Sequence, residues 1–187
     1  MPVISITLLP GYSQAAQNKL VARVTLAARS VIAAAAAGTT VFVNCANTYE
    51  CDGRALTTDG TERVDSSALV RNFLDLMQDR DLAAASRLLA PDFRMQFPGS
   101  PLLHRLEQLV ERSGGDYRRV AKTYERFDES WTDDGAIVYC FGSLYGEWLD
   151  GTPFDDVRFI DRFVVTNGLI SRQDVWNDLA LRRPSGT

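Results

Sequence analysis

Two β-rich runs, Val3–Leu9 and Thr40–Asn44, flank a segment whose apolar residues recur at helical spacing. Pro10-Gly11 is a turn signal after the first run, Ser13 is a favourable N-cap, and Gly38 is a natural stop for the helix. The pattern therefore predicts a β-α-β unit, whose short crossover implies two parallel strands covered by one helix. Because one face of such a sheet stays uncovered, we expect the unit to form a homo-oligomer or to pack on another surface.

The pattern changes at residues 52–63, which are polar and contain glycines. Such a composition is typical of a connecting segment. The sequence therefore predicts a first domain at residues 1–51, a linker at 52–63 and a second domain at 64–187.

The second domain begins with helical periodicity and ends with alternation. Ser66 is a possible cap for a helix, and Asn167-Gly168 is the strongest hairpin signal of the chain. Three helices and one strand followed by four antiparallel strands indicate an α+β fold class, a cone-shaped α+β barrel in which helices pack on a curved sheet around a pocket. The predicted helices cover about 66–77, 82–89 and 102–110, and the predicted strands cover about 93–97, 118–129, 137–148, 156–165 and 169–176.

The charge of the chain narrows its partners. The net charge is −4, the pI is about 5.0, and 45% of the residues are hydrophobic. An acidic protein lacks the basic field that attracts phosphate backbones or anionic membranes, so we expect no nucleic acid and no membrane partner. A small-molecule substrate is the expected partner.

The cysteines and the single histidine bear on metals and compartment. The chain has three cysteines, Cys45, Cys51 and Cys140. An odd number of cysteines without Cys-x-x-Cys spacing indicates neither a disulfide framework nor a zinc site. We expect no metal and no cofactor. Three features favour a cytoplasmic protein. The thiols are expected to be free, the N-terminus has no basic and apolar leader, and no apolar run is long enough to span a membrane.

Asp161 is the first candidate for chemistry. Alternation along the strand places Phe159, Asp161 and Phe163 on one face, and a carboxyl among aromatic rings is a typical general acid or base. The alternative is a structural carboxylate paired with an arginine of a neighbouring strand, such as Arg172.

Other polar residues of the second domain are weaker candidates. His104 opens a predicted helix near the pocket mouth and can shuttle protons near neutral pH, although a surface or capping histidine is commoner. Tyrosines on the curved sheet can bind an enolate oxygen, although core packing is the commoner role. The candidate substrate-binding residues are Tyr124, Tyr139, Tyr145, Phe159 and Phe163.

The segment from Asp65 to Leu181 resembles the SnoaL-like polyketide cyclases of the nuclear-transport-factor-two-like superfamily. The resemblance is carried by Phe73 and Asp81-Leu82 near the opening helices, and more strongly by Ile160-Asp161-Arg162-Phe163 with the following Asn167-Gly168. It implies the cone-shaped fold. It implies little about activity, because this superfamily contains enzymes, binding modules and transport factors.

The first domain resembles the 4-oxalocrotonate tautomerase superfamily in its short β-α-β form. The resemblance is carried by Pro2 after Met1 and by the run Val3–Ser13. It implies that Pro2, once Met1 is removed, is a general acid or base, because an apolar pocket disfavours a charged amine. Tyr12 and Thr40 stand where the best-known members carry carboxylate-binding arginines.

These patterns lead to one functional hypothesis and one alternative. The hypothesis is a cofactor-independent proton-transfer enzyme, either a keto–enol isomerase, a cyclase or a dehydratase, acting on a small hydrophobic carbonyl compound in the C-terminal pocket. Its catalytic candidates are Asp161, Pro2 and His104. The alternative is a non-catalytic small-molecule-binding or assembly module whose first domain is a degenerate oligomerisation segment. A buried, unpaired carboxylate in the pocket would favour the enzyme.

Overall fold

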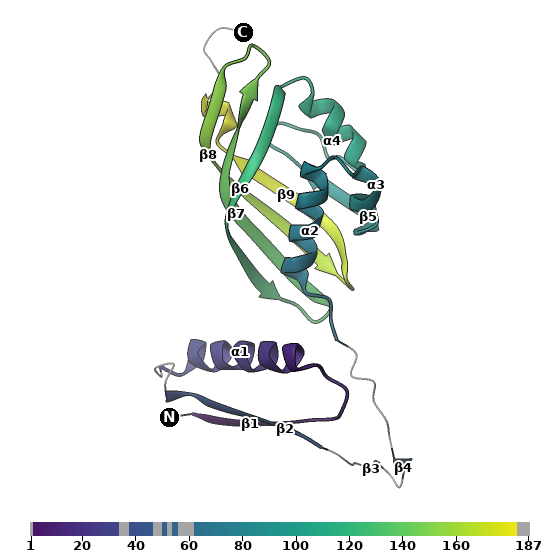
Figure 1. Ribbon diagram of the computed structural model, residues 1–187, viewed down its shortest axis with the longest axis vertical. Helices are drawn as coiled ribbons and strands as arrows, with labels where there is room; N and C mark the ends of the chain where they lie inside the picture. Colours follow the sequence, from purple (N-terminus) through teal and green to yellow (C-terminus); the bar gives the residue numbers. More distant parts are fainter. Residues whose placement is uncertain (1, 34–37, 47–49, 52–53, 56–61, 183–187) are drawn as a thin grey trace. The chain divides into compact units, whose positions relative to one another are not determined.

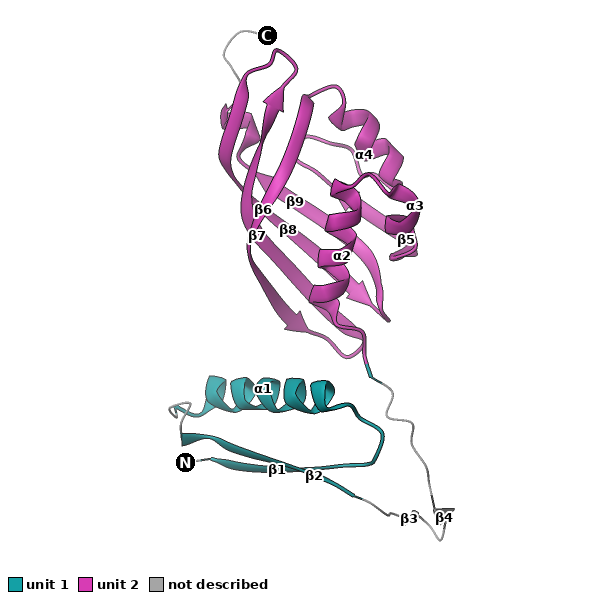
Figure 2. Ribbon diagram, in the orientation of Figure 1, with its two compact units in different colours: residues 1–62 teal, residues 63–187 magenta. Residues whose placement is uncertain are grey.

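The computed structural model describes residues 2–33, 38–46, 50–51, 54–55 and 62–182. The chain divides into two compact units, residues 1–62 and residues 63–187 (Figure 2). Most of the predicted linker at 52–63 lies outside the described residues, so its boundaries stay a prediction.

The first unit contains strand β1 (Val3–Leu8), helix α1 (Gln14–Val31) and strand β2 (Thr40–Cys45) (Figure 1). β1 and β2 pair in parallel. Ser13 caps α1, because its hydroxyl accepts a hydrogen bond from the amide of Ala16 at 3.1 Å. Two short strands, β3 (Glu50–Cys51) and β4 (Arg54–Ala55), pair antiparallel.

The first unit has no fully buried side chain on α1. On its sheet, the inward residues of β1 are only half-buried, and Phe42 of β2 is 53% exposed. Apolar surface of this kind contributes little to stability until something covers it.

The second unit places its helices on one face of a curved five-stranded sheet (Figure 1). The strand order is β5-β9-β8-β7-β6, in which β5 pairs with β9 in parallel and the other neighbours are antiparallel. The expected mixed α+β fold with a curved sheet is confirmed. Its elements are α2 (Ser66–Gln78), α3 (Leu82–Ser86), β5 (Leu89–Gln96), α4 (Leu106–Ser113), β6 (Tyr117–Trp131), β7 (Gly135–Trp148), β8 (Pro153–Thr166), β9 (Leu169–Asn177) and the 3₁₀ helix η2 (Leu179–Arg182).

Several predicted boundaries differ from the structure: α3 ends at Ser86 and not near 89, β5 begins at Leu89 and not near 93, and two others have a clear local cause. Helix α4 begins at Leu106 and not at Leu102, because Leu103 exchanges two backbone hydrogen bonds of 2.9 Å with Met95 of β5. Asp65 caps α2 through its side chain, and Ser66 is the first helical residue. Boundaries depend on such local hydrogen bonds, which periodicity does not reveal.

The core of the second unit forms where α2 packs on the sheet. Phe73 of α2 is 1% exposed, and its ring meets that of Phe163 on β8 edge to face at 5.9 Å between centroids. Along β7, buried residues alternate strictly with more exposed ones, so one face of the strand points to the helices and the other points away.

Two glycines of β7 bring this strand close to its neighbour β6. A Cβ added to Gly142 would overlap the carbonyl oxygen of Thr123, and one added to Gly146 would overlap that of Arg119. Both glycines lie beside shifts in strand register, after Tyr124 on β6 and at Gly146 itself against β8. Shifts of this kind bend a sheet, so the glycines permit the curvature that encloses the pocket.

Candidate functional site

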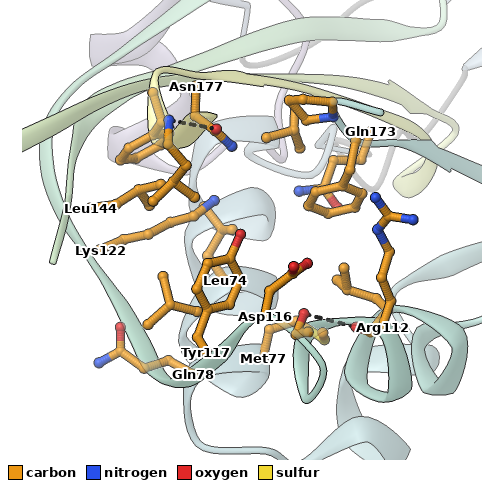
Figure 3. A pocket seen from close by; sticks show the side chains of 18 of the residues that line it. Leu74, Met77, Gln78, Arg112, Asp116, Tyr117, Lys122, Leu144, Gln173 and Asn177 are labelled. Carbon is orange, nitrogen blue, oxygen red and sulfur yellow. Dashed lines mark hydrogen bonds between the residues drawn. The ribbon is translucent and has the colours of Figure 1, made fainter. Parts of the chain in front are cut away.

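A pocket of about 510 Å³ lies on the helix-covered face of the second unit's sheet (Figure 3). This volume is in the range that holds small organic ligands. Helices α2 and α4 and four strands contribute to the wall of the pocket. The wall combines aromatic and aliphatic side chains with polar ones. Its apolar part includes Phe73, Leu74, Met77, Phe97, Leu109, Val120, Leu144, Trp148, Phe159, Val175 and Leu179.

The pocket wall carries an ion pair whose carboxylate is buried. The ammonium of Lys122 on β6 pairs with Oδ2 of Asp161 on β8, and Gln173 on β9 donates to the same oxygen at 3.3 Å. Asp161 is fully buried, whereas the Lys122 side chain is 21% exposed. Lys122 and Gln173 line the pocket and Asp161 does not, so the carboxylate lies behind the wall and the ammonium faces the pocket.

The surroundings of this ion pair leave it few other partners. Oδ1 of Asp161 is buried without a hydrogen-bond partner among the described residues. The ammonium of Lys122 also lies 4.5 Å from the centre of the Phe159 ring, a cation–π distance. A buried charge is costly unless it is paired, so the buried carboxylate of Asp161 keeps the Lys122 ammonium at this place in the wall.

Arginine is not the partner of Asp161. The side chain of Arg172, which the sequence suggested for that role, donates to Asp174 at 2.9 Å. Arg162 binds the same carboxylate at 2.9 Å. Arg162, Arg172 and Asp174 occupy strand positions opposite in parity to Asp161, on the other face of the sheet.

The further polar side chains that line the pocket include those of Tyr124, Asn177 and Asp116. Burial, followed by the nearby Cys140, Asp75 and Asp161, raises the pKa of Tyr124 far above its ordinary value, so its phenol stays protonated. Asn177 uses its amide oxygen to accept a hydrogen bond from Leu179 at 3.2 Å. Asp116 and Lys122 both extend toward the cavity (Figure 3).

The structure brings some of the predicted substrate-binding residues to the pocket and not others. Tyr124 and Phe159 line it. Phe163 is fully buried in the core, against Phe73. Tyr139 and Tyr145 do not line the pocket, because their positions on β7 have the parity of the outer face. Their assignment to the pocket is corrected accordingly.

Two predicted catalytic residues lie elsewhere. His104 is exposed ahead of α4, where its backbone amide donates to Gln108 at 2.9 Å, and it does not line the pocket. Pro2 belongs to the first unit, is half-buried and accepts a hydrogen bond from the amide of Thr40 at 3.1 Å. Met1 lies outside the described residues, so the role of Pro2 stays a prediction.

Lys122 was missed because charged residues on a strand are usually solvated, and Asp116 because it lies in the turn between α4 and β6. One signal was available. The chain has 20 cationic residues, and only Lys19 and Lys122 among them are lysines. Lys122 also alternates with Val120 and Tyr124, which places it on the same strand face as an apolar and an aromatic residue.

Cys140 lies directly opposite Asp161 in the strand register. Burial, followed by the negative charge of Asp161, raises the pKa of the Cys140 thiol to about 12. The folded protein therefore keeps this thiol protonated at pH 8, whereas Cys45 is exposed. Stability from this group is present below the ordinary thiol pKa and is lost as the pH rises through about 12.

We expect a thiol reagent at pH 8 to label Cys45 and to spare Cys140 until the protein is unfolded. Thiolate is the reactive species, and burial prevents both its formation and its contact with the reagent. Counting labelled thiols by intact mass checks this. Cys45→Ala should lower the native count and Cys140→Ala should not. A lower native count in Cys140→Ala would contradict the expectation.

Two further properties concern the described residues. None of their His, Cys, Asp and Glu side chains form a group of three or more suited to a metal ion. Within the same ranges, no helix has the length and apolar character that crossing a membrane requires.

Comparisons with known proteins give the fold. No family model matches the chain, and no curated protein matches it. Among solved structures, an NTF2-like protein of unknown function from Burkholderia pseudomallei is 17% identical with a TM-score of 0.55, covering 62% of this chain and 92% of its own.

Two other structures have similar scores. TerC, co-crystallised with polyporic acid, is 13% identical with a TM-score of 0.52, covering 62% of this chain and 93% of its own. A candidate polyketide cyclase from Pseudomonas putida is 14% identical with a TM-score of 0.50, covering 63% of this chain and 94% of its own. The expected NTF2-like fold is confirmed. At these identities the likeness extends to the fold alone.

Proposed function

We propose that the second unit is a small-molecule enzyme that transfers protons next to a carbonyl group, as an isomerase, cyclase or dehydratase does. The observation that carries this proposal is the Lys122 ammonium, held by the buried Asp161 at the wall of a mainly apolar pocket. An apolar wall favours a hydrophobic substrate, and one charged donor fixes the position of its oxygen.

The chemistry follows from what each group can donate or accept. When a carbon next to a carbonyl loses a proton, negative charge develops on the oxygen, and a fixed ammonium stabilises that charge. Lys122 then gives its proton to the oxygen to form the enol, and Asp161 holds the ammonium in position through their ion pair. Asp116, whose carboxylate is the one carboxylate on the described pocket wall, is the candidate base that accepts the carbon-bound proton.

The names of two proteins with similar folds agree with a small-molecule pocket. TerC was co-crystallised with polyporic acid, and the Pseudomonas putida protein is a candidate polyketide cyclase. They support the class of ligand and leave the reaction to the residues of this chain.

A direct test is deuterium exchange into 2-tetralone, an apolar ketone, followed by NMR in D₂O. We expect the full-length protein to accelerate exchange at the carbons beside the carbonyl. Val120→Trp fills the pocket from its half-buried wall and should remove the acceleration. Pro2→Ala should retain it, and loss in Pro2→Ala would assign the chemistry to the first unit instead.

A second candidate function is ligand binding without turnover. It is favoured by the pairing of Asp161, because the buried carboxylate is already neutralised by Lys122 and does not line the pocket. Saturable binding of 2-tetralone to the pocket with no exchange above background would favour this candidate over the enzyme.

For the first unit we propose a tautomerase-like β-α-β segment that assembles the cytoplasmic protein into a homo-oligomer. The parallel pairing of β1 with β2 and the exposed apolar residues of this unit support it. Pro2 adds a second proton-transfer site if Met1 is removed. Intact mass showing retained Met1 would exclude that site, because the nitrogen of Pro2 would then be an amide.

A further inference from the structure

The charge of the pocket wall is opposite to that of the protein. The described residues that line the pocket include three cations, Arg80, Arg112 and Lys122, and one carboxylate, Asp116. The whole chain has a net charge of −4. Lys122 is already paired with Asp161, so the two arginines supply the positive charge that remains for a ligand.

The two arginines have donors to spare. Arg112 on α4 uses one guanidinium nitrogen to donate to the carbonyl of Gly99 at 3.2 Å, which holds its side chain over the rim. In the described part of the chain, Arg80 makes no side-chain hydrogen bond or ion pair. Both residues are exposed, so they lie at the opening, whereas the partly buried Lys122 lies deeper. Figure 3 shows Arg112 and Lys122 entering the cavity from different sides.

Arg80 occupies a backbone position that usually belongs to glycine. It follows the C-cap of α2 with a φ of 61°, in the left-handed region. The amide of Arg80 donates to the carbonyl of Met77 at 3.3 Å, and the amide of Asp81 donates to the carbonyl of Leu76 at 3.0 Å. These two hydrogen bonds form a Schellman motif at the end of the helix. An arginine here is strained where glycine would be relaxed. Strain of this kind persists mainly where the side chain is needed, and this side chain reaches the pocket.

We propose that the ligand of this pocket is a hydrophobic organic anion, a carboxylate carried on an apolar ring or chain. The inference rests on the proposed function and specifies its substrate class. The anionic group meets Arg80 and Arg112 at the opening, and the apolar body lies between aromatic side chains such as Phe73 and Phe159. This places the ligand's carbonyl oxygen at Lys122. Guanidinium groups suit this role because they bind carboxylates through paired hydrogen bonds.

The test compares two fluorescent probes that share one ring system. 8-Anilinonaphthalene-1-sulfonate carries an anionic group, and N-phenyl-1-naphthylamine lacks it. In the full-length protein, Arg80→Gln and Arg112→Gln should each lower the affinity for the anionic probe about fivefold, the effect of one exposed charge contact. Neither variant should change the affinity for the neutral probe. Arg87→Gln, an exposed arginine outside the pocket wall, should change neither. Added salt should lower the affinity for the anionic probe and leave the affinity for the neutral probe unchanged.

Arg80→Gly provides a second variant. It should melt at a higher temperature because the left-handed position suits glycine, yet it should lose as much affinity for the anionic probe as Arg80→Gln. A loss of affinity in a more stable protein cannot be attributed to unfolding. Retention of full affinity for the anionic probe in both Arg80 variants and in Arg112→Gln would overturn the proposed ligand class.

The pocket-filling variant Val120→Trp separates this inference from the proposed function. If Val120→Trp abolishes binding of both probes and the arginine variants change neither affinity, the pocket binds ligands without distinguishing their charge. The inference then fails and the proposed function stands. If Val120→Trp leaves both affinities unchanged, the probes bind outside the pocket, and the result counts against both.

Discussion

Replacing Lys122 by methionine should lower the free energy of unfolding by about 3 kcal/mol or more, the cost of leaving a buried charge without its partner. Asp161 is fully buried, and Gln173 is its other side-chain hydrogen-bond donor in the described structure. Methionine keeps the length and apolar stem of lysine, so the loss isolates the charge. Urea unfolding, analysed by midpoint and slope, measures it.

Two comparisons make this result specific. Arg118→Met breaks an exposed ion pair between β6 and β7, with Glu147, and should cost less than about 1 kcal/mol. The double variant Lys122→Met/Asp161→Leu replaces the buried pair by apolar residues and should recover most of the lost stability. Equal losses in Lys122→Met and Arg118→Met would show that Asp161 is solvated and not buried.

Asp161→Asn should slow deuterium exchange into 2-tetralone by about a hundredfold, because Lys122, the proposed proton donor, loses the carboxylate that positions it, and the contribution of one positioned acid–base group is at least this large. The amide keeps the shape of the carboxylate and can still accept from Gln173, but it no longer forms the ion pair that fixes the position of the Lys122 ammonium. Asp161 does not touch the substrate in this scheme, so it acts as a positioning residue for Lys122.

A buried aspartate on the other face of the sheet is the matched control. Asp174 is 7% exposed and binds Arg162 and Arg172. Asp174→Asn should reduce stability and leave the exchange rate of the folded protein unchanged. A folded and fully active Asp161→Asn protein would remove Asp161 from the mechanism.

Much of the second unit follows from periodicity in the sequence. Alternation along β8 correctly places Phe159, Asp161 and Phe163 on one face, because a strand has two faces and apolar residues identify the inner one. The parallel pairing of β5 with β9 does not follow in the same way. It joins segments more than seventy positions apart, and a local pattern holds no information about such contacts.

The site was harder to predict than the fold. The position of Asp161 was predicted, but its cation was sought among arginines of neighbouring strands. Lys122 lies on β6, two strands away, and reaches Asp161 across the glycine-containing strand β7. Tyr139 and Tyr145 were assigned to the pocket by residue type, whereas their parity on β7 places them on the outer face.

The close backbone contact at Gly142 and Gly146 has a consequence for redesign of the ligand preference. Because the curvature of the sheet depends on glycines that contact the β6 backbone, the cavity is shaped by main chain at these points. Side chains such as Val120 and Leu144 then fill a space whose outline they do not set. Libraries that vary the wall positions and keep both glycines fixed should yield folded proteins with altered ligand size and polarity. In the same libraries, side chains at the two glycine positions should be depleted.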